Sequence, residues 1–184
     1  MSVPLLVGAV GFLFMLWWWG TYNGLVRRRQ EVKNAWAQID VQLKRRHDLI
    51  PNLVEAVKGY IAHERQTLED VIMARTQAVN ATSLQDKAQA ENLLTQTLRS
   101  LFAVSERYPD LKANQNVMAL QEELTSTENR IAFARQFYND QVTRLNTAIE
   151  TIPTSTVAGA TGFAKAELFE LADATQREAP TVKF

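Results

Sequence analysis

The sequence contains no cysteine among its 184 residues. This excludes a disulfide framework and thiolate metal sites, although it leaves the cellular compartment open. Only seven glycines and five prolines are present, and most lie near the N-terminus or in the last 35 residues. The middle of the chain therefore has few residues that interrupt helices.

The sequence also lacks net charge, because 20 basic residues balance 20 acidic ones. No overall field favours nucleic acid as a partner, and the basic runs lack interleaved aromatic residues. The distribution is uneven, however, since residues 27–46 hold seven basic side chains against two acidic ones. At Arg27 to Arg29 this local excess indicates an affinity for anionic lipid or a simple flank of a membrane span, and at Lys44 to Arg46 it favours a solvated face.

Residues 3–20 form an uncharged apolar run. In a helix they would span about 27 Å at roughly 1.5 Å per residue, which is just enough to cross a bilayer. Aromatic and then basic side chains follow, as is typical where hydrocarbon gives way to head groups. The predicted membrane-anchor residues are Trp17, Trp18, Trp19, Tyr22, Arg27, Arg28 and Arg29.

A cleaved signal peptide is the competing interpretation of this run. It would need a charged segment before the apolar residues and a small-residue cleavage site after them, and the sequence has neither. Because the basic residues follow the run, we expect a single-pass anchor with the N-terminus outside and the helical body in the cytoplasm.

A single apolar stripe runs from Val32 to Ala78, with apolar residues at alternate steps of three and four. This spacing places them on one face of a long, coiled-coil-like helix. Pro51 lies inside the stripe and favours a kink there. Two consecutive steps of four, from Leu53 through Val57 to Ile61, shift the phase of the stripe and favour local unwinding.

Two further helices are expected after the polar stretch at residues 80–83. Ser83 and Asp86 have the spacing of an N-terminal capping box ahead of a helix over residues 84–108. A longer helix of 36 residues should begin between Asn114 and Asn116 and end before Pro153. Short connections between helices favour antiparallel neighbours.

These elements predict an all-α chain in three parts. Residues 1–21 are a transmembrane anchor, and residues 22–152 are an elongated antiparallel bundle of three long helices. Residues 153–184 are a tail with a short amphipathic helix that carries Phe163, Ala166, Phe169 and either Leu168 or Leu171. The tail is expected either to dock on its own bundle or to contact a partner or the membrane.

Charged residues on the apolar faces are informative, because a buried charge is costly unless it is paired. We predict interhelical polar contacts, for instance between Arg75 and Glu128, that set the register of the helices. The alternative is that these side chains reach water from the edge of the face. The residues concerned are Arg46, Glu64, Arg75, Glu128 and Arg135.

The sequence offers little chemistry for catalysis. His63-Glu64 begins like a zinc-peptidase motif, but Thr67 stands where the second histidine is required. His47 has no serine or cysteine nucleophile near it in the sequence, and no glycine-rich phosphate loop is present. We therefore expect no enzyme, no metal site and no cofactor.

Several strings of the chain resemble the LemA family. They are Tyr22-Asn23, Ala35-Trp36, residues 39–46, residues 48–54, Val57-Lys58-Gly59-Tyr60, residues 108–114, Thr127-Glu128-Asn129 and Tyr138-Asn139. The resemblance implies a bacterial inner-membrane protein with one N-terminal span and a helical body. It assigns no catalytic residues. It also associates one branch with magnetosome membranes and other members with membrane peptidases or small membrane proteins.

Three functions follow as hypotheses. The first is a non-catalytic, membrane-anchored scaffold that forms homo-oligomers and organises partners or the membrane at the bilayer surface. The second is an adaptor or regulator of a membrane protease or a signalling complex. The third is a cryptic hydrolase that uses His47, His63 or Glu64.

Overall fold

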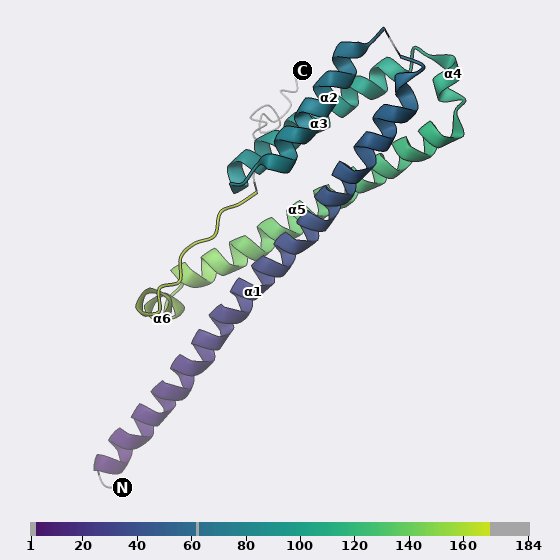
Figure 1. Ribbon diagram of the computed structural model, residues 1–184. Helices are drawn as coiled ribbons and strands as arrows, with labels where there is room; N and C mark the ends of the chain where they lie inside the picture. The colour runs from purple at the N-terminus through teal and green to yellow at the C-terminus, as the bar shows by residue number, and fades with distance from the viewer. Residues whose placement is uncertain (1–2, 62, 170–184) are drawn as a thin grey trace, which may run out of the picture. The chain divides into compact units, whose positions relative to one another are not determined.

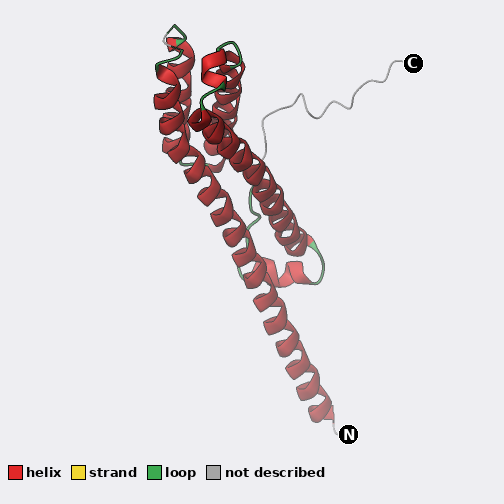
Figure 2. Ribbon diagram, turned by 90° about the vertical axis from the view of Figure 1, so that its right-hand side faces the viewer, coloured by secondary structure: helices red, strands yellow, loops and turns green. Residues whose placement is uncertain are grey.

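The computed structural model describes residues 3–61 and 63–169 (Figure 1). Figure 2 shows that these residues form helices and loops without a strand, which confirms the predicted all-α class. The helices are α1 (Val3–Lys58), α2 (Arg65–Asn80), α3 (Leu84–Ser105), α4 (Pro109–Lys112), α5 (Gln115–Glu150) and α6 (Thr154–Ala160).

Contacts between residues divide the described chain into two compact units. The anchor unit comprises residues 3–40 and 133–168, and the bundle unit comprises residues 41–132 together with Phe169. Helices α1 and α5 each contribute one part to each unit.

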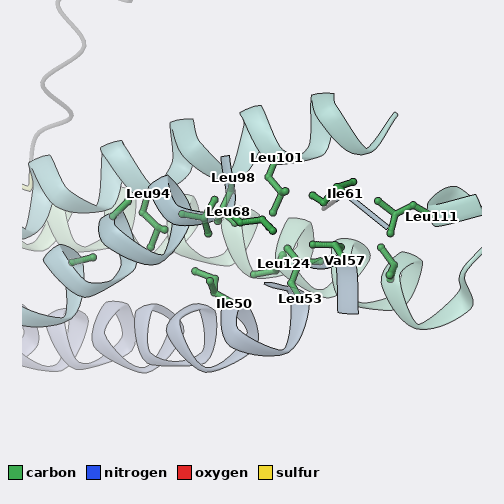
Figure 3. Packing of buried hydrophobic residues seen from close by; sticks show 14 of the residues in the cluster. Ile50, Leu53, Val57, Ile61, Leu68, Leu94, Leu98, Leu101, Leu111 and Leu124 are labelled. Carbon is green, nitrogen blue, oxygen red and sulfur yellow. The ribbon is translucent and has the colours of Figure 1, made fainter. Parts of the chain in front are cut away.

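The bundle unit has a hydrophobic core built from the second part of α1, from α2, α3 and α4, and from the first part of α5. The core side chains interdigitate between these helices (Figure 3). Fully or almost fully buried members include Ile50, Leu53, Val57, Val71, Leu94, Leu101 and Leu111. Burial of such side chains contributes about 1.5–3 kcal/mol each, which makes this core the main source of stability in the unit.

The expected helix over residues 32–78 is interrupted between Lys58 and Arg65. The bundle unit therefore contains four helices longer than one turn, where the sequence predicted three. Helix α1 continues through Pro51, and the interruption begins at Gly59, inside the second of the two steps of four that favoured unwinding. Glycine is a poor helix former, and the turn lets α2 return its apolar face to the same core.

The starts of α3 and α5 agree with the sequence prediction. The Ser83 hydroxyl accepts a hydrogen bond from the backbone N–H of Asp86 at 3.0 Å, as in a capping box. Helix α5 has the predicted 36 residues. The Asn114 side chain accepts hydrogen bonds from the backbone N–H groups of Asn116 and Val117, which caps this helix.

The anchor unit contains the apolar start of α1. Its most apolar window of 18 residues has a mean hydropathy of 1.8 and is 0% buried, so by length and composition the helix could cross a membrane. Later in the same unit α1 packs against the end of α5. The rings of Trp36 and Tyr138 meet edge to face, with centroids 5.6 Å apart.

The predicted position of the short C-terminal helix was wrong. Helix α6 lies earlier, at Thr154–Ala160, in a stretch that looked like an irregular connection. Phe163, Ala166 and Phe169 are not helical, and Leu171 lies outside the described residues. Pro153 precedes α6 as its N-cap residue, with a φ of −92°. Gly162, two residues after the end of α6, has a φ of +71°, which lies in the left-handed region that favours glycine.

We predict that Leu94→Ala lowers the free energy of unfolding of the full-length protein by about 2–5 kcal/mol, because it leaves a cavity in the core. Leu94 has no exposed surface, whereas Val41 of the same unit is 62% exposed. Val41→Ala is the control and should change stability by less than about 0.5 kcal/mol. Denaturant unfolding followed by circular dichroism measures both, and equal losses would contradict the assigned core.

Candidate functional site

A cluster of charged side chains lies inside the bundle unit around Arg46 of α1. Arg46 has no exposed surface, and its guanidinium contacts three side chains from two other helices. It pairs with the buried Glu91 of α3 and donates to the hydroxyl of Thr95 of α3 at 3.0 Å. It also pairs with Glu128 of α5 at 2.5 Å. The sequence brings these groups together because Arg46, Glu91 and Glu128 each fall on the core-facing side of their helix.

Helix α2, the fourth helix of the unit, joins the cluster by a contact between Arg75 and His47 of α1. The His47 ring shares a hydrogen bond of 2.8 Å with the second carboxylate oxygen of Glu91. Nε of Arg75 in α2 donates to the backbone carbonyl of His47 at 2.7 Å. The cluster therefore joins α1, α2, α3 and α5 by polar contacts within a single unit.

Burial and pairing act on the Arg46 guanidinium in opposite directions. Loss of water lowers the pKa of Arg46 from its usual value, and the charge and hydrogen bond of Glu128 oppose that shift. A guanidinium remains charged in proteins, so burial requires an anionic partner, and the buried Glu91 carboxylate supplies one. Removal of Arg46 would leave the Glu91 carboxylate in the interior without its cation.

A small pocket opens next to this cluster in the bundle unit. It has a volume of about 180 Å³ and lies between α3 and α5, with Arg46, Thr95 and Glu128 in its wall. Glu128 is the more accessible of the two carboxylates that pair with Arg46, with 35% of its side chain exposed against 1% for Glu91. Solvent therefore reaches the cluster from the side of Glu128 and not from that of Glu91.

Arg75 and Glu128, the one pair that the sequence suggested, contact different partners in the structure. Glu128 pairs with Arg46, while Arg75 contacts the His47 carbonyl. Glu64 precedes α2 and pairs with Arg107 at 3.2 Å. Arg135 is buried on α5 in the anchor unit.

Sequence reasoning missed Glu91, the most buried acidic residue of the cluster. Glu91 lies three residues after Ala88 and three before Leu94, both of which are buried on the same face of α3. The sequence contained the signal for Glu91, because the same pattern, a charged residue at a position where the helix face is otherwise apolar, had identified Arg46. The pairing of Glu91 with Arg46 could not be inferred without the spatial order of the helices.

The predicted anchor residues lie on α1 in the anchor unit. Trp17 and Trp18 are half-buried against a small cluster of Leu25, Ala148, Val157 and Ala158, whereas Trp19 is exposed. Arg27 and Arg28 are exposed. Arg29 lies over the ring of Phe163 at 5.0 Å from its centroid, and the Tyr22 ring meets Phe163 at 6.0 Å.

The chain after α6 is held to α5 within the anchor unit. The Asn146 side chain donates to the Ala166 carbonyl and accepts from the Ala166 N–H, both at 2.9 Å. The Tyr138 hydroxyl donates to the Glu167 carbonyl at 3.0 Å. Burial, together with the Glu167 charge, raises the pKa of Tyr138 above its usual value, so the hydroxyl keeps the proton that it donates.

A groove lies along α2 and α3 on the surface of the bundle unit. Its volume is about 830 Å³. Large apolar side chains border it and are exposed, notably Ile72, Met73 and Leu93. Across the described ranges, no three histidine, aspartate or glutamate side chains gather in a way that could hold a metal ion.

We predict that Arg46→Met destabilises the bundle unit by about 3–5 kcal/mol, because it leaves Glu91 buried without its cation. Arg45→Met is the matched control on the same helix. Arg45 pairs with Glu123 at 2.6 Å, but both side chains are more than a third exposed, so the loss should be within about 1 kcal/mol. Similar losses in denaturant unfolding would show that burial of the Arg46 pair does not matter.

We predict that Asn146→Ala releases the chain after α6 and speeds tryptic cleavage after Lys165 several-fold, because Ala166 loses both hydrogen bonds. Thr143→Ala changes an exposed position of the same helix and should leave the cleavage rate unaltered. Mass spectrometry of timed digests measures the rate. Identical kinetics in the two variants would refute the role of Asn146.

The sequence of the chain is similar to those of several known proteins. The chain is 29% identical to Protein LemA of Metamycoplasma hominis over 157 residues, which cover 84% of this chain and 69% of that protein. It is 26% identical to Magnetosome protein MamQ 2 of Paramagnetospirillum magneticum over 175 residues, 81% of this chain. It is 25% identical to Magnetosome protein MamQ of Magnetospirillum gryphiswaldense over 80% of its length. The chain spans 64% of each of these two MamQ proteins.

The LemA family model matches residues 35–184, which include the whole bundle unit and the end of α5. The match covers most of the chain and agrees with the strings quoted from the sequence. The chain belongs to the LemA family.

Proposed function

We propose that this protein is a non-catalytic, membrane-anchored scaffold that self-associates and organises partners at the bilayer surface. The apolar start of α1 serves as the anchor. The four-helix bundle unit presents the contact surface. In this proposal the body lies in the cytoplasm and the N-terminus outside, because the basic residues 27–29 follow the apolar run.

The observation that carries the proposal is the continuity of α1. A single helix of 56 residues begins with the exposed apolar segment and later supplies Ile50, Leu53 and Val57 to the core of the bundle unit. A helix that is apolar on every side is stable in lipid, whereas one with a single apolar face packs in a protein core. The same element thus carries an anchor sequence and a structural role in the body.

The contact surface that we assign to self-association is the groove along α2 and α3. Met73 is 62% exposed there, and Ile72 and Leu93 are also exposed. Exposed apolar side chains gathered around a groove are typical of surfaces that bind other proteins. A second copy of the chain is the occupant that a scaffold requires.

The relatives support the general part of this proposal, which is a non-enzymatic protein associated with a membrane. Two of them are named as magnetosome proteins, and none of the three carries the name of an enzyme. The apolar start of α1 is compatible with a membrane location. Membership of the LemA family extends the similarity over the body of the chain.

Cysteine cross-linking in native membranes tests the proposal, because the natural chain has no cysteine to interfere. Met73→Cys places a thiol at the groove, and Glu122→Cys places one at an exposed position of α5 in the same unit. We expect a disulfide-linked dimer with Met73→Cys and none with Glu122→Cys, because only the groove brings two copies together.

Monomer alone with both variants would contradict self-association through the groove. A Met73→Cys adduct with a different protein, with no dimer, would also contradict it. That result would favour the adaptor hypothesis, and its partner would be identified by mass spectrometry.

A further inference from the structure

We propose that the elbow, defined as residues 151–163 from the end of α5 through α6 to Phe163, is a second membrane contact that lies in the bilayer interface and directs Ile152 toward lipid. This inference rests on the anchor role proposed for the start of α1. It concerns a different part of the chain and adds a contact that a single-span anchor does not require.

The first argument is the place of the elbow on α1 within the anchor unit. Val157 and Ala158 of α6 are buried in one cluster with Leu25, and Trp17 and Trp18 pack against that cluster. Phe163, at the end of the elbow, contacts Tyr22 and Arg29. The elbow therefore covers α1 from its tryptophans to its basic residues, which is the stretch that occupies the interface when the apolar segment spans a bilayer.

The register of α5 against α1 places the end of α5, two residues before Ile152, at the level of the aromatic residues of α1. Tyr138 of α5 meets Trp36 of α1. Ten residues further along α5, Ala148 shares a cluster with Leu25, which lies eleven residues earlier on α1. Because both helices rise by about 1.5 Å per residue, two more residues bring Glu150, the last residue of α5, level with about residue 23 of α1. Ile152 follows two residues after this end of α5, which lies next to Tyr22 in register.

The second argument is the composition of the elbow. Residues 151–164 form a run of 14 residues without a charged side chain, although charged residues make up 22% of the sequence. The run is rich in threonine and small residues, and the nearest charges, Glu150 and Lys165, pair with each other. An uncharged elbow can enter the interface without leaving a charge in contact with hydrocarbon.

The third argument is the exposure of Ile152. Its side chain is 83% exposed, the highest value among the large apolar side chains of the described residues. Val157 and Ala158, by contrast, face inward. Exposed Arg27 and Arg28 stand on the neighbouring part of α1, where they would meet anionic head groups. The unit thus carries an exposed apolar side chain at Ile152 and exposed cations on α1, a combination that fits an anionic lipid surface.

Depth-dependent fluorescence quenching tests the inference with the full-length protein in vesicles of phosphatidylcholine and phosphatidylglycerol. Single cysteines are introduced by Ile152→Cys, by Asp140→Cys on α5 and by Val10→Cys in the apolar segment, and each is labelled with an environment-sensitive dye. All three positions are exposed, and the natural chain has no competing thiol. Circular dichroism checks that each labelled protein keeps its helices.

We expect lipids with a quencher near the head groups to reduce the emission of the label at position 152 about twofold more than that at position 140. Quenching at position 152 no greater than at position 140, with strong quenching at position 10 by lipids that carry the quencher deep in the acyl chains, would overturn the inference and leave the anchor intact. Absence of quenching at position 10 would overturn both. A blue-shifted label at position 152 that lipid does not quench would show a protein contact instead and would also overturn the inference.

Discussion

Burial of the Arg46 guanidinium is the constraint on which the bundle unit depends. An isolated charge without exposed surface would cost several kcal/mol, and Glu91 and Glu128 offset that cost from two different helices. Apolar faces can slide past one another by a helical turn with little change in buried area. A guanidinium that must meet two carboxylates and one hydroxyl cannot, so the polar cluster selects one register among those that the hydrophobic core allows.

The cluster also explains why four helices with modest apolar faces form a defined unit. Arg46 and His47 lie on α1, Arg75 on α2, Glu91 on α3 and Glu128 on α5. The core around Leu53, Leu94 and Leu124 supplies most of the stabilisation. The polar contacts determine which residues face one another, and together the two effects give the proposed scaffold a fixed surface.

The sequence predicted the features that depend on local patterns. The Ser83 cap and the length of α5 follow from short-range hydrogen bonding and from an uninterrupted apolar face, and both agree with the structure. The interruption at Gly59 was harder to predict, because the apolar stripe continues on the other side of the turn and periodicity does not report a reversal of direction. That reversal brings Arg75 to His47 and leaves Glu128 for Arg46. The position of α6 was missed because its threonine and glycine residues favour a loop, and packing of Val157 against α1 overrides that preference.

A double-mutant cycle on Arg46 and Glu91 tests the central claim most directly. The free energy of unfolding is measured for the natural protein, for Arg46→Met, for Glu91→Met and for the double variant. We predict a favourable coupling of at least about 2 kcal/mol, with the double variant more stable than either single one, because the two charges are costly only when separated. Additive losses, with a coupling near zero, would contradict the view that this buried pair specifies the arrangement of the helices.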